Sequence, residues 1–313
     1  MLGKTAGGLY WMFRYLERSE NTARLIDAGM RIALTRSSAA QDEWSSILAT
    51  AGVRQGYLEK YETFEQDTAI DYLLRDKDNS SSVLSSIDSA RNNARLVRTA
   101  LTREVWEAVN ECWMIMKKAL ARKVPERDLP EALDRIRQRS AFVRGALHGT
   151  MMRNEIYDFA RVGTFLERSD NTARILDVKY YVLLPSALQV GSSLDNVQWE
   201  TILRSVSAEG AYRWTFGQDV RPRDIANFLM LDKRMPRSLR FCSDKIRDNL
   251  GYLAEDYGVS KPSHDLSEGI CQTFKTSSIQ EIFDTGLHEF IQTFLRENAS
   301  LGRQIEIDYR FYE

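Results

Sequence analysis

The sequence is poor in residues that break helices. It holds 6 prolines and 17 glycines among 313 residues, and no Asn-Gly or Asp-Gly pair of the kind that closes a β-hairpin. Apolar residues instead recur at helical spacing, and in residues 10–34 they share one face at Met12, Leu16, Ala23, Ile26 and Met30. We therefore expect an all-α fold.

Charge of one sign, cysteine pairs and long apolar runs are also missing. The formal net charge is −1, which disfavours nucleic acid and an anionic membrane surface as partners. Cys112, Cys242 and Cys271 are widely spaced, so we expect neither a zinc knuckle nor a redox pair but packing in the core. No apolar run reaches the roughly 20 residues that a membrane span needs, and residues 1–18 do not resemble a signal peptide. The sequence therefore predicts a cytoplasmic protein.

The common catalytic motifs are absent as well. None of His148, His264 and His288 follows a glutamate by three residues, as the helices of a di-iron bundle require. No HExxH, P-loop, GxGxxG or GxSxG sequence occurs. We therefore expect no metal and no nucleotide cofactor on this chain.

Caps and periodicity place the helices. Asn79-Ser80-Ser81 is an N-cap cluster, Pro130 and Pro222 suit first helical turns, and Ser278 with Glu281 has the form of a capping box. The predicted helices cover residues 10–34, 43–50, 64–74, 83–122 with a break near Thr102, 128–147, 156–182, 199–206, 222–231 and 236–257, and one runs from 278 almost to the C-terminus. Residues 257–267 and the segment around Pro185 and Gly191 are expected to be loops.

What the sequence does contain is a repeat. Residues 16–27 read LERSENTARLID and residues 166–177 read LERSDNTARILD, with nine of twelve positions identical. Further pairs keep the same order, among them Trp44 with Trp199 and Asp76-Lys77 with Asp232-Lys233. We therefore expect two helical bundles, residues 1–150 and 151–313, internally duplicated and packed about a pseudo-two-fold axis.

The repeated helix keeps a polar face. Glu17, Asn21 and Arg24 lie together on a helical wheel, and Glu167, Asn171 and Arg174 repeat them. Three interpretations stay open. The set is a buried ion-pair network that holds helices together, a site that binds an anionic or zwitterionic small molecule through arginine and glutamate, or a surface on which a partner docks.

Several motifs along the chain resemble the bacterial Alpha-E family, which is named for its helical content and a Glu-Arg motif. They are Tyr10-Trp11-Met12, Arg14-Tyr15-Leu16-Glu17-Arg18, Ala90-Arg91-x-Asn93-Ala94-Arg95, Glu104-x-Trp106-Glu107, and Phe228-Leu229-x-Leu231-Asp232 followed by Pro236-Arg237-Ser238. The resemblance covers essentially the whole chain, so that the two halves form one continuous unit. It maps the Glu-Arg motif to Glu17-Arg18, with Glu167-Arg168 as its internal echo.

The resemblance implies a functional setting. Members of this family sit beside, or are fused to, a circularly permuted ATP-grasp protein, which implies a role in forming or modifying peptide or amide bonds. ATP and magnesium are then expected on the partner, and a peptide is one expected substrate. The alternative is a non-catalytic scaffold or adaptor for that partner, and the sequence leaves open whether the chain is an enzyme and what its oligomeric state is.

The candidate site residues follow from the repeat and the resemblance together. Glu17 and Glu167 are the candidate catalytic bases, acting on an incoming amine. The candidate ligand-binding residues are Arg18, Asn21, Arg24, Arg91, Arg95, Arg168, Asn171 and Arg174.

Overall fold

The computed structural model describes residues 1–33, 40–183 and 193–313, and every regular element in those ranges is helical. The first half holds α1 (Gly3–Ala33), α2 (Ala40–Thr50), α3 (Arg54–Leu58), α4 (Gln66–Arg75), α5 (Val83–Leu96), α6 (Arg103–Ala119) and α7 (Leu129–Thr150), with 3-10 turns η1 (Arg98–Ala100) and η2 (Glu126–Asp128). The second half holds α8 (Glu155–Leu183), α9 (Ser193–Ser205), α10 (Glu209–Phe216), α11 (Pro222–Leu231), α12 (Leu239–Tyr257), α13 (Pro262–Thr276), α14 (Ile279–Thr285) and α15 (Leu287–Asp308).

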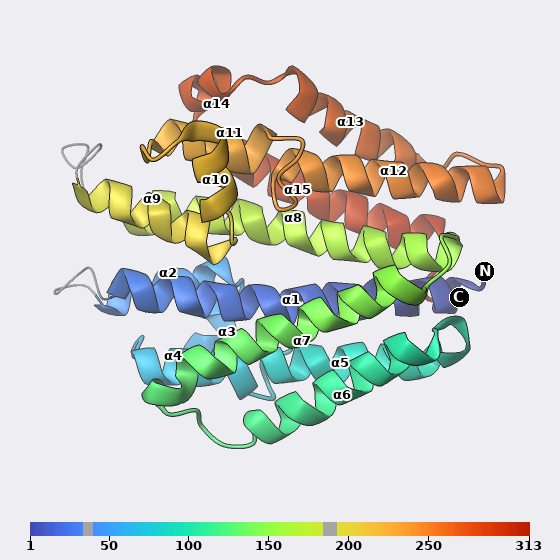
Figure 1. The fold of residues 1–313 in the computed structure, drawn as a ribbon, viewed down its shortest axis with the longest axis horizontal. Coiled ribbons are helices and arrows are strands. Elements are labelled where there is room, and N and C mark those ends of the chain that lie inside the picture. Colours follow the sequence, from blue (N-terminus) through green and yellow to red (C-terminus); the bar gives the residue numbers. More distant parts are fainter. Residues whose placement is uncertain (34–39, 184–192) are drawn as a thin grey trace.

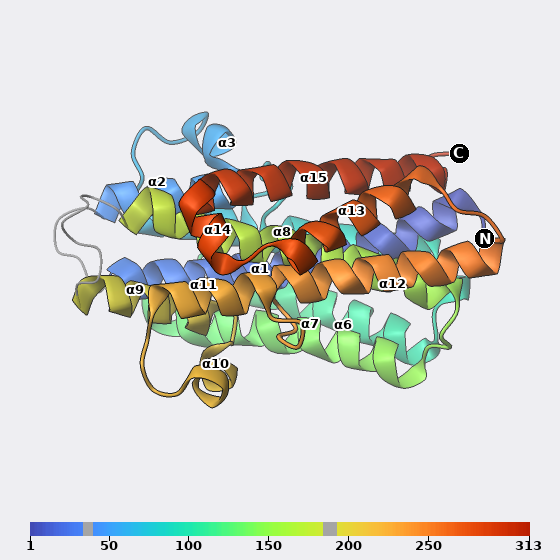
Figure 2. The same ribbon diagram turned by 90° about the horizontal axis from the view of Figure 1, so that it is seen from above.

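The two longest helices, α1 and α8, carry the repeated sequence and pack against each other in the middle of the molecule. Figure 1 shows them side by side, with α5, α6 and α7 on one side and α12, α13 and α15 on the other. Viewed at 90°, the bundle remains elongated along these helices (Figure 2). The repeat therefore lies at the centre of the fold.

The neighbours of α1 have counterparts around α8. α1 packs against α5 and α7, and α8 packs against α12 and α15. The helix after each long helix also reaches across, because α2 contacts α8 and α9 contacts α1. The two halves thus share one core, and residues from both line the interface between α1 and α8.

Local sequence explains how this interface forms. Gly163 of α8 allows the closest approach, since a Cβ there would lie 2.3 Å from the carbonyl oxygen of Tyr10. Ser82 and Ser238 begin α5 and α12 as N-caps, and each side chain accepts a hydrogen bond from the backbone N–H three residues on. These caps fix the residues just before them, Ser81 and Arg237, at the edge of the same interface.

Three sequence-based predictions need correction. Residues 257–267 are not one loop, because α13 begins at Pro262, whose ring suits the first turn of a helix. The last predicted helix is two helices, since Gly286 at φ 111° ends α14. The short helices α3 and α10 were not predicted. The predicted loop around Pro185 and Gly191 lies outside the described residues.

Other predictions agree with the structure. The helical stretch is interrupted near Thr102 as predicted, and Thr102 is the N-cap of α6. Ser278 and Glu281 form the predicted capping box. The three cysteines are buried and unpaired. No described helix combines the length and the apolar character required to cross a membrane.

Candidate functional site

The Glu-Arg pairs of the two repeats bind each other crosswise. Arg168 of α8 donates from Nε and Nη2 to the two carboxylate oxygens of Glu17 of α1, at 2.9 and 3.0 Å. Arg18 of α1 donates in the same way to Glu167 of α8, at 2.6 and 3.1 Å. Both pairs are bidentate, the geometry in which a guanidinium binds a carboxylate most strongly. Each motif therefore ties one long helix to the other.

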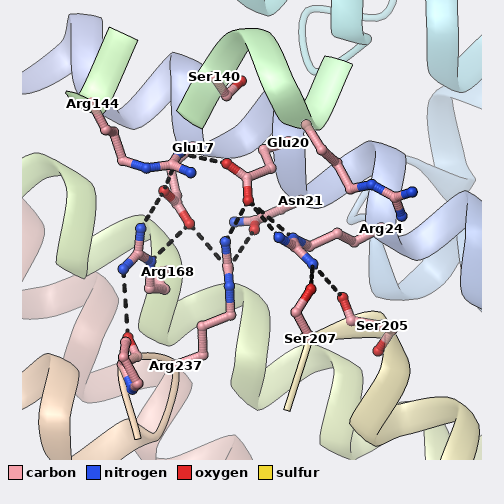
Figure 3. A network of polar contacts seen from close by, with 12 residues as sticks. Glu17, Glu20, Asn21, Arg24, Ser140, Arg144, Arg168, Ser205, Ser207 and Arg237 are labelled. Atoms are coloured by element: carbon pink, nitrogen blue, oxygen red, sulfur yellow. Dashed lines mark hydrogen bonds and ion pairs between the residues drawn. The ribbon is translucent and has the colours of Figure 1, made fainter. Parts of the chain in front are cut away.

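Further arginines surround Glu17. We call Glu17, Glu20 and the arginines that bind them the Glu17 centre (Figure 3). Arg144 of α7 lies 3.2 Å from Glu17 Oε2, and Arg237 lies 3.1 Å from Oε1. Glu17 is 1% exposed, so three guanidinium groups surround a carboxylate that has no access to solvent. Removing the carboxylate would leave Arg168 buried without its ion-pair partner. Arg144 and Arg237 would keep only Glu20 as an acidic partner.

The second acid of the repeat extends the Glu17 centre. Arg24 donates to Glu20 Oε1 at 2.8 Å and Arg237 donates to the same oxygen at 2.6 Å, while Arg237 also donates to Asn21 Oδ1 at 3.3 Å. Arg24 then reaches across to α9, where it donates to the carbonyl oxygen of Ser205. Glu17 and Arg24 share a helix face but do not pair with each other, because seven residues of helix rise separate them by roughly 10 Å.

Glu167, Asp170 and the arginines that bind them form a second group, which we call the Glu167 centre. It follows the same plan with different surroundings. Arg14 of α1 donates to Glu167 Oε2 at 2.8 Å, as Arg144 does to Glu17 Oε2. Arg174 donates to Asp170 at 2.7 Å and, at 3.4 Å, to the carbonyl oxygen of Thr50 at the end of α2. No described residue takes the place of Arg237 here, and Asn171 Oδ1 is buried without a hydrogen-bond partner.

A cavity of about 430 Å³ lies at this position. Four arginines line it together with three acids: Arg14, Arg18, Arg174, Arg303, Glu167, Asp170 and Glu306. Ser81 and Gly302 also line it and add little side-chain volume. The volume is in the range of small-molecule sites. A more open depression reaches Glu20, Arg24 and Arg144 from outside, but not Glu17, Arg168 or Arg237.

The pKa shifts follow from this pairing. Burial opposes the charged form of Glu167, but Arg18 and Arg14 outweigh it and lower the pKa to about 2. The pKa of Glu17 is lowered too, by Arg168, Arg237 and Arg144 against the effect of burial. A general base works best with a pKa near the working pH. These carboxylates are therefore suited to holding cations rather than to taking up protons.

A family model described as a predicted α-helical domain with a conserved ER motif matches residues 1–309. The chain belongs to the Alpha-E family. Comparison with curated proteins and with solved structures finds no match. In this Alpha-E chain, the two Glu-Arg sequences Glu17-Arg18 and Glu167-Arg168 form the crossed pairs described above.

The structure brings together most residues predicted for the site. Arg18, Glu167, Asn171 and Arg174 line the cavity, and Asn21 also reaches its wall. Glu17, Arg24 and Arg168 belong to the Glu17 centre instead. Arg91 and Arg95 lie on α5 away from both centres. Arg91 donates to Asn110 and stacks on Trp113, and Arg95 is exposed.

Other members of the two centres were not predicted. Glu20 and Asp170 occupy the same position of the repeat, which is glutamate in one copy and aspartate in the other. An acid kept at this position was a signal that could have been used. Arg237 belongs to a motif shared with the family, but nothing in the sequence places it beside Glu17. Arg14 belongs to a motif shared with the family but has no copy in the repeat. Arg144 and Arg303 carry no pattern that distinguishes them from arginines on solvated faces. Within the described ranges, no three His, Cys, Asp or Glu side chains gather as a metal site.

Proposed function

We propose that this Alpha-E chain binds a carboxylate- or phosphate-bearing small molecule in the cavity beside the Glu167 centre. The cavity carries this proposal. Arg303 is exposed and lines the cavity, and among the described residues it has no acidic partner within ion-pair distance. A guanidinium without an internal partner is available to a carboxylate or phosphate.

We further propose that the ligand belongs to a reaction that forms or modifies a peptide or amide bond together with a circularly permuted ATP-grasp protein. The family's genomic setting supports this step. ATP and magnesium would then sit on the partner, and the Alpha-E chain would hold a carboxylate, an acyl phosphate or a peptide. Glu167 would orient the ligand rather than act as a base, because its pKa is about 2.

Binding is tested with inorganic phosphate and acetate as probes, by calorimetric titration of the full chain. Arg303→Gln should weaken binding of both by about tenfold, since one charge-assisted contact is lost. Arg296→Gln is the matched control, because Arg296 is exposed on the same helix but does not line the cavity. Equal binding to all three proteins, or to none, would refute the proposed anion site.

The partnership is tested separately. The Alpha-E chain and the ATP-grasp protein should co-purify, and ATP turnover with amino acids or peptides should need both proteins. Arg303→Gln should lower turnover at an unchanged melting temperature. Turnover by the ATP-grasp protein alone, with no complex, would contradict this part of the proposal.

A scaffold role is the second candidate, and the Glu17 centre favours it. This centre is filled by the chain's own arginines, and it joins α1 to α7, α8 and the segment before α12. A chain that served only as an adaptor would need these links and no ligand. Loss of partner binding in Glu17→Gln, with Arg303→Gln unaffected, would select this alternative.

We also infer that the two halves arose by duplication and pack about a pseudo-two-fold axis. The crossed pairs Glu17–Arg168 and Glu167–Arg18 support this, because a two-fold rotation that swaps the halves would turn one pair into the other. The paired contacts α2–α8 and α9–α1 support it in the same way. Superposition of residues 1–150 on 151–313 in a crystal structure of the chain tests the inference, and unrelated helix orders would refute it.

A further inference from the structure

The difference between the two centres indicates what the cavity recognises. Ser82 and Ser238 are matching N-caps, so Ser81 stands in the first half where Arg237 stands in the second. Arg237 points into the Glu17 centre (Figure 3), whereas Ser81 lines the cavity of the Glu167 centre. One centre thus contains a guanidinium from the chain, and the other has an open volume at the matching place.

The acceptors used by Arg237 have counterparts in the cavity. Arg237 contacts Glu17 Oε1, Glu20 Oε1 and Asn21 Oδ1. The matching residues are Glu167, Asp170 and Asn171, and all three line the cavity.

Each of these matching residues has capacity for one more donor. Glu167 Oε1 accepts one hydrogen bond, from Arg18, whereas Glu17 Oε1 is contacted by Arg168 and Arg237. Asp170 is held by Arg174 alone within the described chain, while Glu20 also receives Arg237 and Arg144. Asn171 Oδ1 is buried without a partner.

From these matched positions we propose that the cavity binds a ligand whose guanidinium occupies the place of Arg237 and whose carboxylate lies against Arg303. The ligand is thus arginine or a peptide that carries one. The inference rests on the proposed carboxylate site and adds to it the cationic group.

Charge explains why both groups are needed. The cavity wall carries four arginines against three acids, so a cation alone would add to a positive excess. The Glu17 centre shows this cost: burial, together with repulsion from Arg24 and Arg168, lowers the pKa of Arg237 to about 10 despite its acidic partners. A carboxylate on the same ligand offsets the charge of the guanidinium, so arginine (net +1) adds less positive charge than agmatine (net +2). A guanidinium also fits better than an ammonium, because its planar fork reaches acceptors on two residues at once.

Calorimetric titration of the full chain with L-arginine, L-citrulline and agmatine tests the proposal. L-Citrulline replaces the guanidinium with a neutral group of similar shape, and agmatine lacks the carboxylate. L-Arginine should bind at least tenfold more tightly than either. Equal affinity for arginine and citrulline, both weakened by Arg303→Gln, would overturn the guanidinium subsite and leave the carboxylate site standing. Equal affinity for arginine and agmatine, unaffected by Arg303→Gln, would keep the guanidinium subsite and refute the carboxylate site.

Variants locate the subsite. Ser81→Arg places a guanidinium where the second half has one, so arginine binding should be lost while the melting temperature stays the same or rises. Asn171→Leu removes an acceptor that has no internal partner, so it should weaken arginine binding with little loss of stability. Gln272→Arg, on the exposed face of α13, is the control for an added charge. Undiminished arginine binding in both Ser81→Arg and Asn171→Leu, or no binding of L-arginine to the unmodified chain at millimolar concentration, would overturn the proposal.

Discussion

The Glu17 and Glu167 centres are built from the same twelve-residue pattern, yet their surroundings differ. Arg144 and Arg237 enclose Glu17, whereas Gly302 and Ser81 stand near the Glu167 centre and leave a cavity of about 430 Å³. A Cβ at Gly302 would lie 3.0 Å from Leu166 and 3.3 Å from the Tyr10 hydroxyl, so a larger residue would crowd these two neighbours. Residues outside the motif thus separate a closed ion-pair network from an open one, and the motif alone does not say which is which.

The largest effect is expected at the closed centre. Glu17→Gln leaves Arg144, Arg168 and Arg237 around a neutral amide, so it should lower the free energy of unfolding by about 3–5 kcal/mol. Urea denaturation measures this, with Glu255→Gln on the exposed face of α12 as the control. A loss no greater than that of the control would mean that the Glu17 centre does not stabilise the fold.

Glu167→Gln measures the corresponding loss of stability at the open centre. The side chains of Arg14 and Arg18 are 17% and 25% exposed, so water in the cavity can solvate them once the carboxylate is neutral. The loss should be about 2 kcal/mol, smaller than for Glu17→Gln. Parallel urea titrations decide this, and a larger loss at Glu167 would reverse the assignment of the closed and open centres.

Arg237→Ser makes the closed centre resemble the open one. Glu17 and Glu20 keep Arg168, Arg144 and Arg24, so the variant should fold with a loss of about 1–2 kcal/mol. A crystal structure of the variant should show a new cavity beside Asn21. Collapse of α12 onto α1 without a cavity would show that the backbone, rather than Arg237, sets the difference.

The smallest effect lies outside both centres. Burial, with the nearby Asp256, raises the pKa of Asp158 to about 7. An acid whose pKa is raised in the folded state binds more protons there, so its contribution to stability falls as the pH rises from about 4 through 7. Asp158→Asn should therefore raise the melting temperature by a few degrees at pH 8 and change it little at pH 4. An equal change at both pH values would contradict the shift.

The sequence predicts the fold better than the site, for a physical reason. Helical periodicity and caps such as Thr102 and Ser278 are local, so they are readable from neighbouring residues. The cross-pairing of Glu17 with Arg168 depends on how α1 meets α8, and the sequence reveals only that both residues are kept in the repeat. Arg144 and Arg237 lie far from Glu17 in the sequence, and each is one arginine among many, so the sequence does not place them beside it. The cavity is lined by Ser81, which the sequence marks only as part of an N-cap cluster, and by Gly302, which no motif marks.

The same Glu-Arg pair is enclosed in one half of the molecule and faces a cavity in the other. Double-mutant cycles on Glu17–Arg168 and Glu167–Arg18, with each glutamate changed to Gln and each arginine to Met, test it most directly by urea unfolding. A clearly larger coupling energy is expected for Glu17–Arg168, where water is excluded. Equal couplings, or a larger one for Glu167–Arg18, would contradict it.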